Sequence, residues 1–202
     1  MEKSRVVLPQ VFGTRTPAWR SLSSGQELLT CPVFSVIAVE KERVTSGARA
    51  TFFHVEAPTW VNVVATTTEN DLILIRQYRH GINDYVLELP AGIVTEGEDP
   101  ALTAKRELLE ETGFEGRKVG LLGRLLPNPG LQNNECLTYC FDSCSQITDP
   151  SPETFEDIVV QTVSLDSLDD LIVSGKLRNA LSIAAIQIFQ AAQRIGRNTS
   201  SP

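Results

Sequence analysis

Apolar residues recur along the chain mostly in short runs, a pattern that predicts many strands and few helices. Short apolar runs bounded by turn residues are typical of strands. They occur at residues 31–44, 50–56, 60–68, 72–79, 85–90, 117–126, 136–142 and 157–165. Capping residues and stop glycines predict helices at residues 99–113, 166–174 and 180–194. This order of elements predicts an α/β fold with a mixed sheet and helices on its faces.

The same pattern divides the chain into three parts. Residues 1–59 are expected to form a β-rich element, whose two clearest strands make a small antiparallel sheet suited to an accessory or oligomerisation role. Residues 60–195 are expected to form the main domain. Residues 196–202 are polar and terminal, so we expect a flexible tail there.

Charge and composition narrow the classes of partner. The chain has 202 residues and a net charge of −7, which excludes a general electrostatic attraction to nucleic acid or to anionic membranes. No apolar run is long enough to span a bilayer, and the first residues lack the apolar segment of a signal peptide. Four cysteines without the spacing of a zinc site favour free thiols in a reducing compartment. We therefore expect a cytoplasmic protein that binds neither nucleic acid nor membranes.

The predicted helix at residues 99–113 is unusually acidic on one side. Asp99 is placed to cap it, Pro100 suits its first position and Gly113 suits a left-handed stop. At about 100° per residue, one face is expected to carry the apolar residues Ala101, Leu102, Leu108 and Leu109. The opposite face is expected to carry Thr103 and the three carboxylates of Glu107, Glu110 and Glu111.

Three carboxylates on one arc favour a cation site over an ordinary solvated face. Like charges four residues apart, as in Glu107 and Glu111, destabilise a helix unless a cation binds between them. The turn at residues 90–92 brings free carbonyls near the start of the helix, and hard oxygen ligands of both kinds suit magnesium. Arg106 is then interpreted as the residue that orients a neighbouring glutamate; the alternative is a surface ion pair between Arg106 and Glu110.

This stretch resembles the Nudix box, which reads Gly, five residues, Glu, seven residues, then Arg-Glu-aliphatic-any-Glu-Glu-any-Gly-aliphatic. The matching positions are Gly92, Glu98, Arg106, Glu107, Leu108, Glu110, Glu111 and Gly113, with the aromatic Phe114 in the last aliphatic place. The resemblance extends over roughly residues 60–190. It implies the Nudix α/β/α sandwich with a mixed sheet, here with the N-terminal antiparallel element added. It also implies a hydrolase that depends on magnesium, for which manganese can substitute.

The resemblance also implies roles for individual residues. Glu107 and Glu111 correspond to the principal metal ligands, and Glu110 assists them. The Ala91 carbonyl corresponds to a further ligand, and Glu98 to a supporting carboxylate. The implied catalytic residues are Arg106, Glu107, Glu110, Glu111 and Glu135.

Two further segments, RQYRHG at 76–81 and LELPAG at 87–92, resemble the ADP-ribose and nucleotide-sugar pyrophosphatase branch of that family. The resemblance implies that Arg79 contacts the substrate diphosphate, and that Glu88 and Gly92 belong to the substrate-binding part of the site. The substrate would be ADP-ribose or a related nucleoside diphosphate sugar. The products would be a nucleoside monophosphate and a sugar phosphate.

Members of this branch are commonly homodimers whose N-terminal sheets help to build the partner's site. Residues 31–56 fit that role, so we expect a homodimer. Trp60 and Trp19 are candidates to stack on a nucleobase, although a tryptophan more often belongs to the core.

The carboxylate that activates water stays open between three positions. Several members place a glutamate after the Pro-Gly of the loop at residues 127–134, and Glu135 stands one position later than expected. Glu135 could equally be an exposed loop residue. Glu153 and Glu156 are the alternatives, and the sequence does not choose between them.

Two other functions are compatible with the box. One is a nucleotide-sensing regulator that keeps the fold without the chemistry, but this chain retains the box glutamates and carries no basic appendage. The other is a nucleoside triphosphate or coenzyme pyrophosphatase, against which the segments at 76–81 and 87–92 argue.

Overall fold

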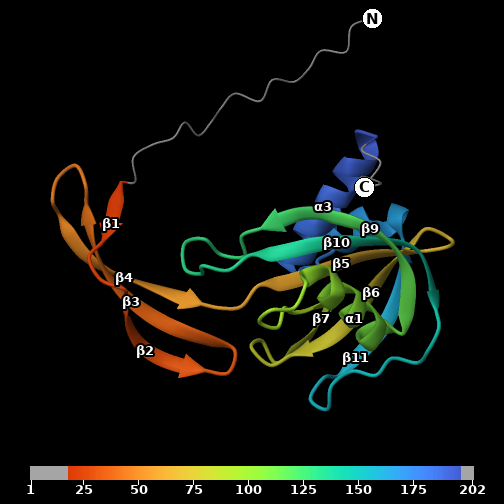
Figure 1. Cartoon of the computed structure of the whole chain (residues 1–202). Coiled ribbons are helices and arrows are strands. Elements are labelled where there is room, and N and C mark those ends of the chain that lie inside the picture. Colours follow the sequence, from red (N-terminus) through yellow and green to blue (C-terminus); the bar gives the residue numbers. More distant parts are fainter. Residues whose placement is uncertain (1–17, 197–202) are drawn as a thin grey trace, which may run out of the picture. The chain divides into compact units, whose positions relative to one another are not determined.

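The computed structural model describes residues 18–196, which form two compact units divided between Glu56 and Ala57 (Figure 1). The first unit is an antiparallel sheet of four strands. They are β1 (Trp19–Ser21), β2 (Gln26–Cys31), β3 (Phe34–Arg43) and β4 (Arg49–Glu56), and β3 pairs with each of the others. The predicted strands at 31–44 and 50–56 correspond to β3 and β4, whereas β1 and β2 were not predicted. Apart from residue 196, the expected tail lies outside the described residues.

The second unit is built on a mixed sheet of seven strands. They are β5 (Trp60–Thr67), β6 (Asp71–Arg79), β7 (Asp84–Glu88), β8 (Ala91–Ile93), β9 (Phe114–Leu125), β10 (Cys136–Gln146) and β11 (Ile158–Ser164). The strand order is β11-β6-β5-β10-β9, with β7 paired to β6 and β8 paired to β5. β5 and β10 run parallel, while the other named pairs are antiparallel. The mixed sheet is therefore confirmed, and β8 is the strand that the sequence did not predict.

Two long helices cover opposite faces of this sheet, α1 (Pro100–Thr112) and α3 (Ala180–Arg194) (Figure 1). The predicted helix at 166–174 is a 3-10 turn, η1 (Leu165–Ser167), followed by the short α2 (Leu168–Val173). No helix within residues 18–196 combines the length and apolar character needed to cross a bilayer. The layers of helix, sheet and helix confirm the α/β/α sandwich.

The alternation of side chains along β5 explains why both faces need a helix. Val61 and Val63 belong to the apolar cluster that contains Leu108 of α1. Val64 belongs to a second cluster, which contains Ile186 of α3. Successive side chains of a strand point to opposite faces, so a central strand with apolar residues at both parities must be covered on both sides.

The four cysteines are free thiols, and three of them lie in the core on β10. Burial raises the pKa of Cys136 and Cys140 to about 12. Such thiols stay protonated at neutral pH, and they contribute to packing as small apolar side chains.

Candidate active site

The helix α1 has the ends that its sequence predicted. The Asp99 carboxylate accepts the N–H of Ala101 at 2.9 Å, and Pro100 is the first helical residue. The helix stops at Gly113, whose φ of +74° is left-handed. A Cβ atom at Gly113 would also overlap the carbonyl oxygen of Thr148, so both backbone conformation and space require glycine there.

The buried face of α1 differs from the predicted one. Leu102, which the projection placed on the apolar face, is 61% exposed, while Glu111 is only 2% exposed. Ala104, Leu108 and Glu111 follow one another at spacings of four and three, and all three are buried. The acidic arc is therefore rotated toward the sheet, and its last carboxylate lies inside the protein.

Glu111 is held by strand β8. Its Oε2 accepts the backbone N–H of Ala91 at 2.9 Å. Burial raises the pKa of Glu111 to about 9, and the Ala91 hydrogen bond offsets only part of that effect. One hydrogen bond does not offset the cost of burying the ionised carboxylate, so a bound cation would stabilise the ionised form strongly.

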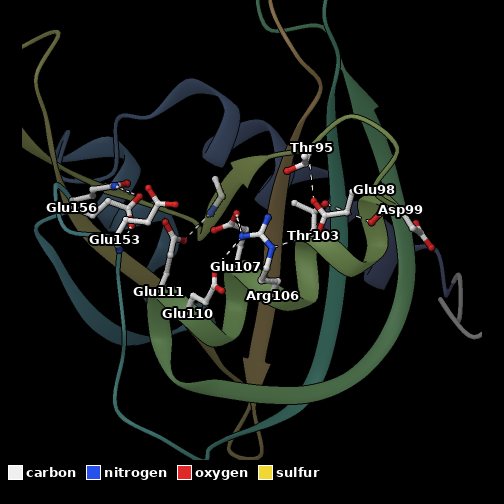
Figure 2. Close-up of polar contacts among 12 residues, drawn as sticks. Thr95, Glu98, Asp99, Thr103, Arg106, Glu107, Glu110, Glu111, Glu153 and Glu156 are labelled. Atoms are coloured by element: carbon white, nitrogen blue, oxygen red, sulfur yellow. Dashed lines mark hydrogen bonds and ion pairs between the residues drawn. The ribbon is translucent and has the colours of Figure 1, made fainter. Parts of the chain in front are cut away.

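Arg106 gathers the other carboxylates of the box around its guanidinium group (Figure 2). Its Nη1 lies 2.9 Å from Glu107 Oε1 and 3.0 Å from Glu110 Oε2. Its Nε lies 3.4 Å from Glu98 Oε1 on the other side. Burial raises the pKa of Glu107 to about 7 despite the nearby arginine, whereas the Thr103 hydroxyl and then Arg106 lower the pKa of Glu98.

Glu107 also lies directly against the backbone of Gly92 on β8. A Cβ atom at residue 92 would overlap Oε1, Cδ and Cγ of Glu107, because the two groups are already in contact. The absence of a side chain at Gly92 therefore makes the space that the Glu107 carboxylate occupies.

We expect Gly92→Ala to lower kcat/KM by roughly 10-fold, since it displaces a side chain next to the reacting groups. The melting temperature should change little, because the flexible Glu107 side chain can move aside. Gly81→Ala is the matched control, since a Cβ atom there meets nothing within 4 Å. Steady-state kinetics and thermal melts of the two variants check this, and equal activity of both would contradict it.

Two of the three candidates for the water-activating carboxylate lie in the same cavity as the box carboxylates, and one does not. Glu153 and Glu156 come from the connection between β10 and β11 and line the same cavity as Glu107 and Glu111 (Figure 2). Glu156 accepts the backbone N–H of Glu153 at 2.9 Å and lies 3.4 Å from the amide nitrogen of Gln77. The structure does not bring Glu135 to this cavity.

Glu135 is the residue just before β10, and it does not line this cavity. Its carboxylate pairs with Arg124 Nη1 at 2.9 Å, and the side chain is 42% exposed. Its backbone carbonyl accepts the N–H of Trp60. Glu135 therefore lies in a half-exposed ion pair outside the cavity lining.

Arg79 and Glu88 meet on the paired strands β6 and β7. Arg79 Nε donates to Glu88 Oε1 at 2.7 Å, and the Glu88 side chain is 3% exposed against 44% for Arg79. The other oxygen of Glu88 accepts the amide of Asn179 at 2.6 Å. Asn179 also caps α3, since its Oδ1 accepts the N–H of Ser182. The sequence predicted this cap, but nothing in it placed Asn179 beside Glu88.

A cavity of about 640 Å³ brings these groups together. Its wall carries the box residues Ala91, Gly92, Arg106, Glu107, Glu110 and Glu111, together with Arg79, Glu88, Glu153, Glu156 and Trp60. Trp19, the other tryptophan considered for stacking, instead packs edge-on against Phe52 in the first unit. Glu98 supports Arg106 from outside the wall.

The donor set of this cavity fits a hard divalent cation. Carboxylate and carbonyl oxygens are the ligands that magnesium and manganese share. In the part of the chain from 18 to 196, no three His, Cys, Asp or Glu side chains already converge on one point for a metal. The contacts explain this, because Glu107 is turned toward Arg106 and Glu111 toward the Ala91 amide.

The chain matches the NUDIX domain over residues 58–183. It is 29% identical over 159 residues to an ADP-ribose pyrophosphatase of Bacillus subtilis (strain 168), covering 78% of this chain and 85% of the relative. It is 30% identical over 144 residues to a methanol dehydrogenase activator of Bacillus methanolicus, covering 70% of this chain and 77% of the relative. The solved structure of an ADP compounds hydrolase has the same fold, with a TM-score of 0.78 at 22% identity, covering 92% of this chain and 100% of that one. The resemblance drawn from the box is thus confirmed, and this chain belongs to the NUDIX domain family.

Proposed function

We propose that this protein hydrolyses the pyrophosphate bond of ADP-ribose or a related nucleoside diphosphate sugar, and releases a nucleoside monophosphate and a sugar phosphate. One observation carries the proposal: a single cavity contains both the buried carboxylates of the box and the Arg79 guanidinium. The first group suits a divalent cation, and the second suits a diphosphate. Similarity to the Bacillus subtilis ADP-ribose pyrophosphatase supports this choice of substrate.

Arg79 binds the diphosphate in this proposal. Glu88 engages it through Nε, which leaves the two terminal nitrogens of the guanidinium without a partner among the described residues. Those nitrogens are suited to a pair of phosphate oxygens. The buried Glu88 fixes the orientation of the guanidinium and offsets part of its charge.

Glu107 and Glu111 would hold the divalent cation, magnesium or manganese, with Glu110 and the Ala91 carbonyl as additional donors. When bound, the cation offsets the negative charge of the diphosphate and makes a bound water more acidic. Arg106 contacts Glu98, Glu107 and Glu110 and would orient these carboxylates. Water then attacks one phosphorus, and the bond from that phosphorus to the bridging oxygen breaks.

Glu153 accepts the proton of the attacking water. Glu156 already receives a hydrogen bond at 2.9 Å and so fits a positioning role, whereas Glu153 lines the cavity nearby. We expect Glu153→Gln to lower kcat by about 10²-fold, the usual contribution of a general base. Glu135→Gln is the matched control and should retain nearly full activity. Stopped-flow or steady-state measurements of kcat test this expectation. A large loss of kcat in Glu135→Gln with no loss in Glu153→Gln would make Glu135 the general base.

The activity itself is tested by incubating the purified chain with magnesium and a panel of substrates. AMP and ribose 5-phosphate should appear from ADP-ribose, faster than products appear from ATP or from a coenzyme with a diphosphate. Preferred cleavage of ATP would favour the triphosphate alternative. Tight binding of ADP-ribose without turnover would favour the nucleotide-sensing alternative.

We also propose that the first unit pairs with a second copy of the chain. Large apolar side chains are exposed on its strands β2, β3 and β4, namely Leu28, Leu29, Phe34, Phe52 and Phe53. Large apolar side chains that stay exposed on a small sheet are typical of a protein interface.

Phe53→Asp should convert the dimer into a monomer, because it places a charge on an apolar interface. Phe53 is 58% exposed within one chain, so the substitution should not disturb folding. Val173→Asp, which changes an exposed apolar residue of α2, is the control. Sedimentation equilibrium measures the mass of each variant, and a wild-type monomer would contradict the proposal.

A further inference from the structure

The connection between β10 and β11 carries Glu153 and Glu156 on a closed turn beside the cavity (Figure 2). The Glu156 N–H donates to the Glu153 carbonyl at 3.0 Å, and the Glu156 carboxylate accepts the Glu153 N–H at 2.9 Å. Before the turn, the Ser151 N–H donates to the Glu110 carbonyl of α1 at 2.8 Å. The place of Glu153 in the cavity therefore also depends on what holds the end of the turn, at Glu156 and Asp157.

Strand β6 holds the end of this turn from both faces of the sheet. Gln77 and Tyr78 are successive residues of β6, so their side chains point to opposite faces. On one face, the Gln77 amide nitrogen lies 3.4 Å from Glu156 Oε1. The Tyr78 N–H donates to the Asp157 carbonyl at 3.1 Å, next to the pair of Ile158 and Gln77 where β11 begins. Asp157 therefore lies opposite Tyr78 and shares its face.

Tyr85 of β7 reaches Asp157 on this second face. It pairs with Tyr78, so Asp157, Tyr78 and Tyr85 form one row across three strands. The Tyr85 hydroxyl donates to Asp157 Oδ2, and its ring packs edge-on against the Tyr78 ring, with centroids 5.4 Å apart. The Arg76 guanidinium lies over the Tyr85 ring, 4.6 Å from its centroid. These contacts hold the ring with its hydroxyl directed at the residue that follows the turn.

We propose that Tyr85 is a positioning residue for the reaction: its hydrogen bond to Asp157 holds the turn at residues 153–156 and so places Glu153 in the cavity. This inference rests on the proposed function, in which Glu153 accepts the proton of the attacking water. Tyr85 does not line the cavity, so it acts through the turn and not on the substrate. Catalytic groups are sensitive to such support, because a displacement of about 1 Å can cost roughly 10²-fold in rate.

The experiment begins with Tyr85→Phe, which removes the hydroxyl and keeps the ring that packs on Tyr78. We expect kcat for ADP-ribose to fall by roughly 10-fold and KM to stay unchanged. Hydrogen exchange of the backbone amides at residues 151–157, measured by mass spectrometry, should become roughly 10-fold faster. Tyr78→Phe is the matched control, since Tyr78 bonds to Asp157 through its backbone N–H, which phenylalanine retains. It should change neither kcat nor exchange, and unchanged exchange in Tyr85→Phe would overturn the proposal.

A double-mutant cycle with Glu153→Gln tests whether Tyr85 acts through Glu153. In the Glu153→Gln background, Tyr85→Phe should lower kcat very little further, whereas a merely structural role would cost the same factor in both backgrounds. Equal losses in both backgrounds, or faster exchange without any loss of kcat, would overturn the positioning role. A chain that cleaves no nucleoside diphosphate sugar would contradict the proposed function, while faster exchange in Tyr85→Phe would still support the hold of Tyr85 on the turn.

Discussion

Glu111→Gln is expected to lower kcat for ADP-ribose by roughly 10⁴-fold and to leave the fold intact. Glutamine keeps the size of the side chain and can still accept the Ala91 N–H, so the packing of α1 on the sheet should survive. It loses the negative charge that a divalent cation needs. Glu115→Gln is the control, because Glu115 is a half-exposed partner of Lys105 outside the cavity.

The same variant should be more stable than the wild type in a metal chelator, and increasingly so as the pH rises. Burial raises the pKa of Glu111 to about 9 in the folded protein, against 4.5 as the ordinary value. The raised pKa of Glu111 therefore contributes its full stabilisation of the folded protein below pH 4.5. This contribution to the free energy of unfolding is lost progressively as the pH rises toward 9. Glutamine does not titrate, so its thermal melting profile should be flatter across this range.

Thermal melts from pH 5 to pH 9, with chelator and with magnesium, check this expectation. Each kcal/mol of differential stability should appear as a shift of roughly 2–4 °C. Magnesium should raise the melting temperature of the wild type most at high pH and leave that of Glu111→Gln unchanged. Near wild-type turnover by Glu111→Gln at saturating magnesium would remove Glu111 from the metal site.

Local chemistry determined what the sequence predicted well. The start and stop of α1 depend on Asp99, Pro100 and Gly113, which act within a few residues of chain, and the structure has them as expected. The strands of the main sheet other than β8 depend on runs of apolar residues and were likewise predicted. The buried face of α1 was harder to predict. A helical projection does not show that β8 packs on the side of Glu111 and not on the side of Leu102.

Long-range contacts determined what the sequence did not predict. Glu153 and Glu156 reach the cavity because the connection from β10 to β11 runs past the end of α1, where the Ser151 N–H donates to the Glu110 carbonyl. Nothing local distinguishes these glutamates from Glu135.

Arg79→Ala is expected to lower kcat/KM by about 10³-fold, because the diphosphate loses its charged, fork-shaped partner. It also leaves Glu88 with Asn179 alone, and burial already raises the pKa of Glu88 despite the nearby arginine. The free energy of unfolding should therefore fall as well. Arg79→Lys keeps the charge but loses the planar fork and the Nε–H, so its activity should be intermediate.

Asn179→Asp tests whether Asn179 helps to orient Arg79 through Glu88 or only caps helix α3. Aspartate caps a helix as well as asparagine, so the contact with the Ser182 N–H should persist. It cannot donate to Glu88, whose carboxylate then faces a second acceptor 2.6 Å away. If Asn179 acts through Arg79, then Asn179→Asp should cost about 10-fold in kcat/KM in the wild type and almost nothing in the Arg79→Ala background. Additive losses in the double-mutant cycle would mean that Asn179 only stabilises the helix, and that Glu88 orients the guanidinium without its help.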